Sequence, residues 1–289
     1  MLQQYSPFEL TVFGLILFNV IFSAMAFGNY RRFEQLKFNV GSILQDKEYY
    51  RMISSSFIHG SWFHLGINMY VLYMFSGSLS FFTTIPSFLI IFFASMLLSH
   101  FVSLFVNRHK SYYSAVGASG AVSGVLYASI YFMPNTPLHI IFIPFVEFPA
   151  WSFGVLYMIY SIYAAKKNND NIGHDAHIGG AIAGLIIAFI LSPENAFQNW
   201  KIILAMMAPV VYYIFTMFQT QDILSNFKRI DKGEVGNYSN RSIDDLYNEG
   251  RTLQIRELNE LLEKVKENGL DSLSKNEKDR LDFLSQELK

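Results

Sequence analysis

A serine and a histidine in two apolar stretches of the chain have the residue types of a nucleophile and its base. Ser119 lies in "VGASGAVSG" and His177 lies in "GHDAHIGGAIAGL". Ionisable and polar side chains are rare in segments that are apolar enough to cross a membrane, and there they usually face the bundle interior and mark function. A serine hydroxyl beside a neutral imidazole is an activated nucleophile, so the pair could attack a carbonyl group if the fold brings it together.

Glycine patterns beside both residues could bring them together. A GxxxG pattern begins at Gly120, directly after Ser119, and another begins at Gly180, three residues after His177. Small residues at this spacing let two membrane helices approach closely. One further apolar stretch separates these two, so their helices run in the same direction, and the hydroxyl and the imidazole would lie at a similar depth. Asp175 lies on another face of its helix, which favours a dyad over a triad.

Further polar groups could stabilise the negative charge of an oxyanion. Ser119 would lie in the first turn of its helix, where its backbone N–H has no partner within the helix and can donate to the oxyanion. His64 and Asn68 lie four residues apart in another apolar stretch, hence on one face of a helix, and could donate to the same oxygen. His59 lies at the entrance to that stretch.

Each of these residues also has a purely structural interpretation. A histidine in a membrane segment can simply bond to a neighbouring helix, and a serine between glycines can be a packing contact. A metal transporter or metalloenzyme is another interpretation, with His59, His64, His174 and His177 as ligands. The chain has no HExxH motif and no carboxylate ligand within a membrane segment, so we expect no bound metal and no cofactor.

The charges divide the chain into an apolar part and a part typical of soluble protein. Residues 1–218 hold 10 of the 22 Lys and Arg and 8 of the 23 Asp and Glu, and residues 219–289 hold the rest. A formal net charge of −1 gives no support for a nucleic-acid partner. Because cysteine is absent, the chain can have no disulfide, no thiol nucleophile and no cysteine-ligated metal.

The apolar part predicts an all-α, polytopic transmembrane helix bundle. A helix needs roughly 20 apolar residues to cross the hydrocarbon core. The expected spans are 8–28, 62–82, 87–106, 117–133, 150–165, 176–192 and 200–218. We expect a six-span core over 1–192, a seventh span within 193–218, a polar linker at 219–250 and a soluble helical hairpin at 251–289.

The connections between the spans differ in character. Aromatic and apolar residues lie among the charges of 29–61, which predicts a folded and partly interfacial loop. The polar stretch 166–174 predicts a mobile loop. In the hairpin, Ser274 and Glu277 have the spacing of a capping box, and the first helix should stop at Gly269.

These motifs resemble those of the rhomboid family of intramembrane serine proteases, over about residues 8–192. The serine motif Gly-x-Ser-Gly appears as Gly117-Ala118-Ser119-Gly120, the second-span signature as His59, His64 and Asn68, and the last motif as Ala176-His177-Ile178-Gly179-Gly180. The serine motif alone is weakly specific. All three motifs in this order, each on an apolar span, are strongly specific.

The resemblance implies a role for each motif residue. Ser119 is the nucleophile, His177 is the general base, and His64, Asn68 and the Ser119 amide line the oxyanion site. Gly117, Gly120, Gly180 and His59 support the motifs.

The resemblance also implies how substrates are selected. Span five, near Trp151 and Phe153, would be the substrate gate, and the following loop would be its cap. The substrates would be single-span membrane proteins, cut in or near their transmembrane helices where the helix is destabilised. Unwinding is needed because a protease must reach an extended peptide bond.

Two positions depart from the family pattern. A Trp-Arg pair of the first loop is Tyr50-Arg51 here, which we expect to be tolerated. In many members an aromatic residue four positions after the serine packs against the catalytic histidine, whereas this chain has Ser123. His177 is then held more loosely, or another group supports it.

Two arguments about orientation disagree. Lys and Arg cluster in the first, third and fifth gaps, which by the positive-inside rule places these gaps in the cytoplasm. The family resemblance implies the reverse, and we adopt it, for a multi-pass protein of a bacterial inner (plasma) membrane.

The alternative function is a catalytically inactive rhomboid-like membrane chaperone or binding protein. The expected partners are membrane-protein substrates, the lipid bilayer and an unknown protein bound by the hairpin.

Overall fold

The computed structural model describes residues 5–140, 143–167 and 173–219, and, near the C-terminus, 258, 261–266, 269–274, 277, 278, 281 and 285. The chain forms two compact units, Met1–Thr216 and Met217–Lys289. The loop expected at 166–174 lies largely outside the described residues, and so do the linker and much of the hairpin.

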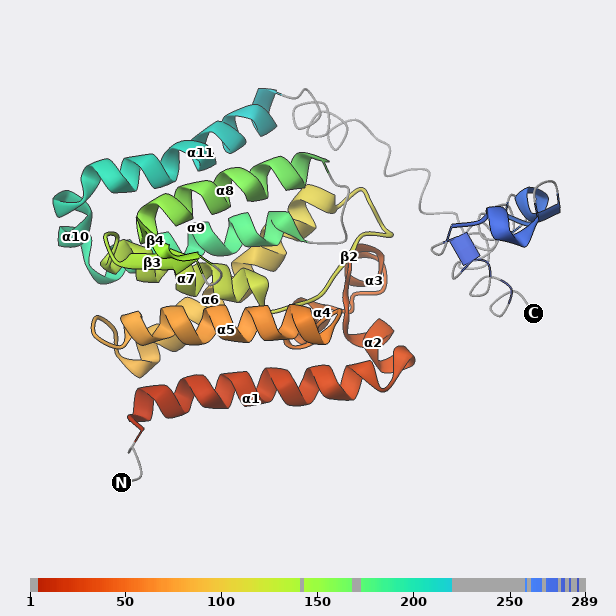
Figure 1. Ribbon diagram of the computed structural model, residues 1–289, viewed down its shortest axis with the longest axis horizontal. Coiled ribbons are helices and arrows are strands. Elements are labelled where there is room, and N and C mark those ends of the chain that lie inside the picture. Colours follow the sequence, from red (N-terminus) through yellow and green to blue (C-terminus); the bar gives the residue numbers. More distant parts are fainter. Residues whose placement is uncertain are drawn as a thin grey trace. The chain divides into compact units, whose positions relative to one another are not determined.

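The first unit is a bundle of long helices, as expected (Figure 1). These helices are α1 (Pro7–Phe27), α5 (Trp62–Leu79), α6 (Ile85–Asn107), α7 (Ser119–Phe132), α8 (Ala150–Lys167), α9 (His174–Leu191) and α11 (Trp200–Gln219). Each expected span therefore coincides, apart from a few residues at its ends, with one of these helices. Among the described helices, α1, α6 and α9 are long and apolar enough to cross a membrane by length and composition alone, and α7 and Trp200–Phe215 are shorter apolar helices.

The connection between α1 and α5 is folded, as predicted. It contains α2 (Tyr30–Leu36), β1 (Phe38–Asn39), α3 (Val40–Leu44), α4 (Arg51–Ser54) and the 3₁₀ helix η1 (Ser55–Phe57). Phe38, Val40, Ile43 and Met52 form its buried apolar cluster. The strand β1 pairs antiparallel with β2 (Ser114–Ala115), so the first loop is joined to the chain directly before α7.

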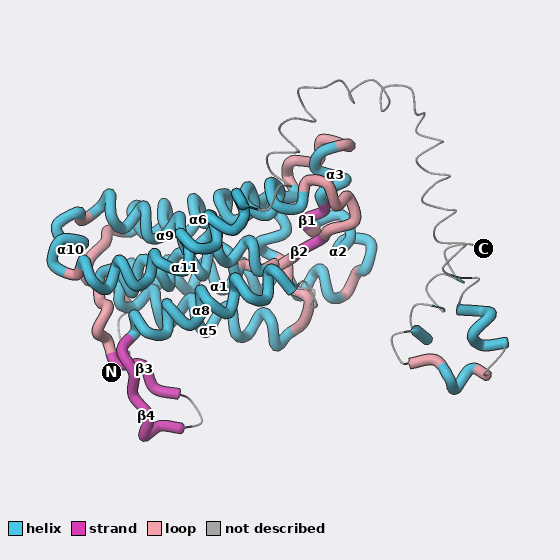
Figure 2. Tube along the Cα trace, turned by 90° about the horizontal axis from the view of Figure 1, so that it is seen from above, coloured by secondary structure: helices cyan, strands magenta, loops and turns pink. Residues whose placement is uncertain are grey.

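A β-hairpin between α7 and α8 is an element that the hydrophobic pattern does not predict. Its strands are β3 (Pro137–Ile140) and β4 (Ile143–Pro149), paired antiparallel with an irregularity between His139 and Ile140. The hairpin lies at the opposite end of the bundle from β1 and β2 (Figures 1 and 2). A short helix, α10 (Pro193–Gln198), connects α9 to α11.

The centre of the bundle is the contact of α7 with α6 and α9, where small residues allow backbones to touch. A methyl group built on Gly180 would overlap the carbonyl oxygen of Gly120, and one on Gly184 would overlap that of Gly124. On the α6 side, a methyl group on Gly120 would overlap Ser99. The expected packing of the two GxxxG patterns is therefore confirmed, and α7 is buried along its length.

The described residues of the second unit agree with the sequence pattern. Residues 261–266 are helical, Gly269 has a φ of 79°, and a short 3₁₀ helix (Leu270–Ser272) follows. The backbone N–H of Glu277 donates to Ser274 Oγ over 3.3 Å, and the N–H of Ser274 donates to Glu277 Oε2 over 2.8 Å. This reciprocal pair is the predicted capping box.

Candidate active site

Ser119 and His177 meet at one end of the bundle. Ser119 is the first residue of α7, and His177 lies in the first turn of α9. The distance between Ser119 Oγ and His177 Nε2 is 2.8 Å, which is hydrogen-bond distance. The glycine contacts between α7 and α9 begin one residue after Ser119, so close backbone packing sets this distance. The arrangement is that of a nucleophile and a base.

Gly117 lets the ring of His64 approach the serine. Its φ is 119°, a backbone conformation that glycine adopts without strain and other residues rarely adopt. A methyl group there would lie 2.7 Å from Cε1 and 3.0 Å from Nε2 of His64. The N–H of Gly117 also donates to the carbonyl oxygen of Ser55 over 2.9 Å, which ties this turn to the first loop. The structure therefore brings the His64 imidazole to the turn that carries Ser119.

Asn68 lies one turn further along α5. Its Nδ2 donates to the carbonyl oxygen of His64 over 2.9 Å, and its side chain is buried. The structure thus places His64 beside the turn that carries Ser119, and Asn68 one turn further along α5, bonded to the backbone of His64. Their role in binding an oxyanion stays a prediction.

His59 connects α1 to the serine turn through both ring nitrogens. Ser23 Oγ donates to the carbonyl oxygen of Phe57 over 3.1 Å and lies 2.9 Å from His59 Nδ1. The serine hydrogen is therefore engaged, so Nδ1 carries the proton and donates to Ser23. The other nitrogen, Nε2, accepts from the N–H of Ala118 over 3.3 Å. This network fixes one neutral tautomer of His59.

The environment of His59 keeps this ring neutral. Burial and, to a smaller degree, the neighbouring His64 lower the pKa of His59 to about 3. The sequence motif indicates His59, but Ser23 carries no sequence signal beyond being a polar residue in an apolar span. The network shows that Ala118, the residue before Ser119, is held from α1.

Tyr157 of α8 takes the place beside His177 that Ser123 leaves open. The Tyr157 and His177 rings stack at 5.9 Å between centroids and 22° between planes. Ser123 Oγ lies 3.1 Å from the Tyr157 hydroxyl. Of the two outcomes that the sequence left open for His177, the structure shows support by another group. Sequence reasoning did not identify Tyr157, because its place depends on how α8 packs against α9.

Asp175 belongs to a different set of contacts from the dyad. Its Oδ2 accepts from Nδ2 of Asn107 in α6 over 3.0 Å, and its Oδ1 accepts from the hydroxyl of Tyr213 in α11 over 3.1 Å. The carboxylate is buried. Asp175 therefore joins α6, α9 and α11 at the end of α9 that carries His177. This agrees with the expectation that Asp175 lies on a different face of the helix from His177.

The two expected gate residues lie at the start of α8. The N–H of Trp151 donates to the carbonyl oxygen of Pro134, beyond the end of α7 that is remote from Ser119. A helix with the 14 residues of α7 is about 21 Å long, so Trp151 is far from the dyad. Phe153 stacks on Tyr157 at 6.0 Å and 13°. Phe153 therefore contacts His177 only indirectly, through the ring of Tyr157. A gating role for Trp151 and Phe153 stays a prediction.

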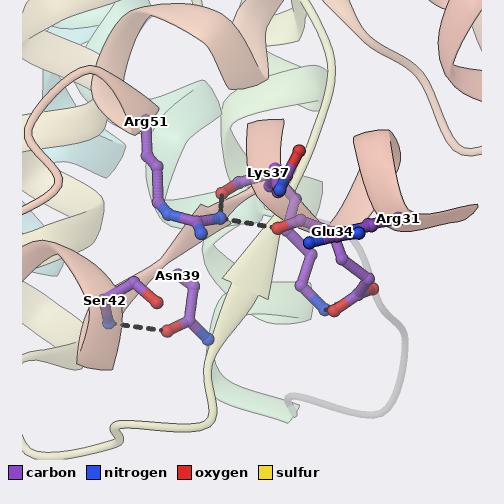
Figure 3. Close-up of a pocket in the computed structure, with 7 residues that line it drawn as sticks. Arg31, Glu34, Lys37, Asn39, Ser42 and Arg51 are labelled. Carbon is purple, nitrogen blue, oxygen red and sulfur yellow. Dashed lines mark hydrogen bonds and ion pairs between the residues drawn. The ribbon is translucent and has the colours of Figure 1, made fainter. Parts of the chain in front are cut away.

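Arg51 organises the first loop at a distance from the dyad. It lines a shallow pocket of about 390 Å³ with Arg31, Glu34, Gln35, Lys37, Asn39 and Ser42 (Figure 3). Its Nη1 donates to the carbonyl oxygens of Glu34 and Lys37 over 2.6 and 3.0 Å, and its Nε donates to Glu48 over 2.5 Å. The guanidinium group also lies over the ring of Tyr50, and the side chain is buried. Arg51 thus holds the first loop together.

Four of the histidines lie as two pairs of rings. The rings of His59 and His64 lie 5.1 Å apart, and those of His174 and His177 lie 5.4 Å apart, both edge to face. In the part of the chain that the structure describes, no three His, Asp or Glu side chains group as metal ligands would.

Comparison with known proteins agrees with this geometry. A family model described as "Rhomboid domain" matches residues 46–194, more than half of the chain, and includes Ser119 and His177. A second model, described as a family of unknown function (DUF6576), matches residues 241–287, within the expected linker and hairpin.

Several curated proteins are similar to the same region. The presenilin-associated rhomboid-like protein, mitochondrial, of Homo sapiens is 34% identical over 141 residues, which cover 46% of this chain and 36% of that protein. Rhomboid protein 1, mitochondrial, of Saccharomyces cerevisiae is 26% identical over 144 residues, covering 49% and 41%. RHOMBOID-like protein 12, mitochondrial, of Arabidopsis thaliana is 29% identical over 153 residues, covering 47% and 44%.

These relatives limit what can be transferred. The chain spans between 36% and 44% of their lengths, so their whole-protein activities are not carried over by similarity alone. Their names describe them as mitochondrial, which gives no support to the expected bacterial plasma membrane. The compartment of this chain stays a prediction.

Proposed function

The chain belongs to the rhomboid family of membrane proteins, whose members are usually intramembrane serine proteases, and we propose that it is an active serine endopeptidase of this kind. The observation that carries the proposal is the distance of 2.8 Å between Ser119 Oγ and His177 Nε2. The proposed reaction is hydrolysis of peptide bonds in or near the transmembrane helices of membrane-protein substrates.

In the first half of the reaction, Ser119 Oγ attacks the carbonyl carbon of the substrate while His177 Nε2 accepts the hydroxyl proton. The carbonyl oxygen becomes an oxyanion, and in this proposal the backbone N–H of Ser119, at the start of α7, and the imidazole of His64, beside Gly117, stabilise it. His177 then donates its proton to the leaving amine, the C–N bond breaks and an ester with Ser119 remains.

In the second half, His177 takes a proton from a water molecule, whose oxygen attacks the ester carbon. The C–O bond to Ser119 breaks, the serine oxygen regains the proton from His177, and a free carboxylate product leaves. Ser119 and His177 both lie in the first turns of their helices, and His64 lies in the first turn of α5 behind its N-cap Ser61. The dyad is therefore near one end of the bundle, close to the aqueous side from which water must come.

The same position explains why the expected substrates are cut where their helices are weak. Peptide bonds inside a membrane helix are hydrogen-bonded to one another and shielded by side chains. A short unwound segment at the depth of Ser119 would present an extended bond to the hydroxyl. Single-span membrane proteins with helix-breaking residues near one interface are therefore the proposed substrate class.

A catalytically inactive member of the family is the alternative, and the geometry of the dyad favours the enzyme. The test uses the purified full-length protein in liposomes with a single-span model substrate. We expect cleavage by the wild type and by Ser80→Ala, an exposed serine at the end of α5. Ser119→Ala and His177→Ala should each abolish cleavage, and undiminished cleavage in either variant would rule out the dyad mechanism.

For the whole chain, we propose a six-span protease core at 1–192, a seventh transmembrane helix within 193–218, a linker at 219–250 and a hairpin at 251–289 that binds a protein partner. The orientation with the active site opening outward is likewise a proposal, and labelling of single introduced cysteines with a membrane-impermeant reagent tests it in this cysteine-free chain.

A further inference from the structure

The ring that supports His177 belongs to α8, a helix that contributes neither member of the dyad. Along α8 and the preceding strand, three aromatic side chains follow one another toward the active site. Phe148 and Phe153 lie 6.4 Å apart, Phe153 and Tyr157 lie 6.0 Å apart, and Tyr157 and His177 lie 5.9 Å apart. His177 thus ends a column of rings that begins at β4.

Tyr157 is fixed to α7 as well as to His177. Its hydroxyl is 3.1 Å from Ser123 Oγ, one helical turn after the nucleophile. One turn before Tyr157, the hydroxyl of Tyr127 donates to the carbonyl oxygen of Gly154 over 2.5 Å. These two polar contacts set the position of α8 against α7 at the depth where the Tyr157 ring meets the imidazole.

The stacking on Tyr157 constrains the plane of the His177 ring. The contact between Nε2 and Ser119 Oγ fixes the position of one ring atom, whereas packing against the faces of the ring opposes its rotation about the bond to Cβ. The face of Tyr157, nearly parallel to the imidazole, and the edge of His174, at 82°, restrict that rotation. Aromatic pairs of this kind have preferred geometries, so they fix orientation as well as burying area.

The outer face of α8 has few contacts within the bundle. Leu156, Ile159 and Tyr163 are 64%, 50% and 61% exposed, whereas α7 is buried along its whole length. A shift of α8 therefore breaks fewer core contacts than a shift of α7 or α9 would. Such a shift would remove the ring that holds the base.

We propose that Tyr157 is a positioning residue that holds the His177 imidazole with Nε2 toward Ser119, so that the dyad is complete only when α8 lies against α7. The inference rests on the proposed protease function. It adds that the position of the fifth long helix controls the base, through one stacked ring and the bond between Tyr157 and Ser123.

The experiment measures kcat and KM separately, in liposomes, for the wild type, Ser119→Ala, Tyr157→Phe and Tyr157→Leu. Tyr157→Phe keeps the ring and should lower kcat by about twofold to threefold. Tyr157→Leu removes the ring and should lower kcat by about tenfold to a hundredfold with little change in KM, because small misplacements of a reacting group have effects of this size. Tyr163→Leu, an exposed tyrosine two turns along α8, is the matched control and should retain the wild-type kcat.

A double-mutant cycle tests the link to α7. Ser123→Ala should lower kcat as Tyr157→Phe does, and the two changes combined should do no more than either alone, because they remove the same hydrogen bond. If Tyr157→Leu does not fold, Tyr157→Met, which fills a similar volume without a ring, replaces it. The inference would be overturned if Tyr157→Leu, or Tyr157→Met in its place, had the kcat of the wild type. It would also be overturned if Tyr157→Phe lowered kcat as much as the variant without a ring. Absence of cleavage by the wild type would instead reject the proposed function.

Discussion

The carbonyl oxygen of Gly120 lies so close to the α-carbon of Gly180 that a side chain of one methyl group would overlap it. The same relationship repeats one turn further along, between Gly124 and Gly184. Two backbones in contact at two successive turns hold α7 and α9 in one register. Because Ser119 and His177 precede these glycines, the register of the two helices is also the geometry of the dyad.

The first prediction is that Gly180→Ala separates the two helices. Overlap with a backbone carbonyl cannot be relieved by a rotamer change, so α9 must move. We expect a loss of about 1–3 kcal/mol in the free energy of unfolding, as for other overpacked sites, and a loss of cleavage at temperatures where the variant is still folded. The measurements are unfolding in detergent micelles and the liposome cleavage assay.

Gly77→Ala is the matched control for this substitution. Gly77 lies within α5, and a methyl group there would meet no heavy atom within 4 Å. The same chemical change should be neutral or stabilising by roughly 0.5–1 kcal/mol, since alanine favours a helix. Equal effects of the two substitutions would show that close packing at Gly180 is not what holds the dyad.

The second prediction concerns the turn before the nucleophile. Gly117→Ala forces a side chain into a φ of 119° and into contact with His64. Backbone strain of this kind costs of order 1–3 kcal/mol, and the turn would relax by moving Ser119 away from the base. We expect cleavage to fall by about a hundredfold, measured as kcat/KM in liposomes.

Gly60→Ala is the matched control for Gly117→Ala, because Gly60 also lies near His64. A methyl group on Gly60 would meet its nearest neighbours, His64 Nδ1 and Val116, at 4.0 Å, which is ordinary contact. That variant should retain at least a third of the wild-type activity. An active Gly117→Ala variant would mean that His64 and the serine turn tolerate a different arrangement.

Local sequence patterns were sufficient to predict the seven long helices and the contact between Ser119 and His177. Long apolar stretches mark α1, α6 and α9 directly, and the GxxxG patterns predict the contact that brings Ser119 to His177. Both patterns are formed by residues that lie close together in the sequence. The capping box at Ser274 is local for the same reason.

The contacts that the sequence did not predict all join distant elements. Tyr157 is one of several aromatic residues in its helix, and its role follows from the packing of α8 against α9. Ser23 acquires its role from a histidine 36 residues away. The segment that forms the β3–β4 hairpin is mostly apolar, so it lacks the regular alternation of apolar and polar residues that predicts a strand.

The third prediction is a pH dependence from His59. Its pKa is lowered to about 3 in the fold, mainly by burial. Between that value and the ordinary value of 6.5, the unfolded chain binds more protons than the folded one, so stability falls as the pH drops from 6.5 toward 3. One such group changes the free energy of unfolding by up to about 1.4 kcal/mol per pH unit.

The variant that tests this is His59→Gln, which does not titrate. Its midpoint of thermal unfolding should be lower than that of the wild type at pH 7, since the bonds to Ser23 and Ala118 are perturbed. Between pH 6.5 and 5, however, its midpoint should decline less steeply. His109→Gln, at an exposed histidine, is the control, and equal flattening in both variants would contradict the assignment to His59.

The last prediction concerns the anchoring of α11 to the helix that carries His177. The hydroxyl of Tyr213 and the amide of Asn107 both donate to the Asp175 carboxylate. Tyr213→Phe removes one donor and should lower the free energy of unfolding by about 1 kcal/mol, within the range for polar contacts between membrane helices. Tyr212→Phe, at a tyrosine 60% exposed on the same helix, should have no measurable effect.

Asp175→Asn should be more damaging than Tyr213→Phe, although it keeps the size of the side chain. Two donors face this carboxylate, and an asparagine offers one acceptor oxygen and an amide that is itself a donor. One buried donor then loses its acceptor, at a cost of about 1–3 kcal/mol. We expect the largest loss of stability in Asp175→Asn, an intermediate loss in Tyr213→Phe, and partial loss of cleavage in both, because the first turn of α9 is less firmly held. Unfolding in detergent gives the order, and an Asp175→Asn variant as stable as the wild type would show that the three helices do not depend on this cluster.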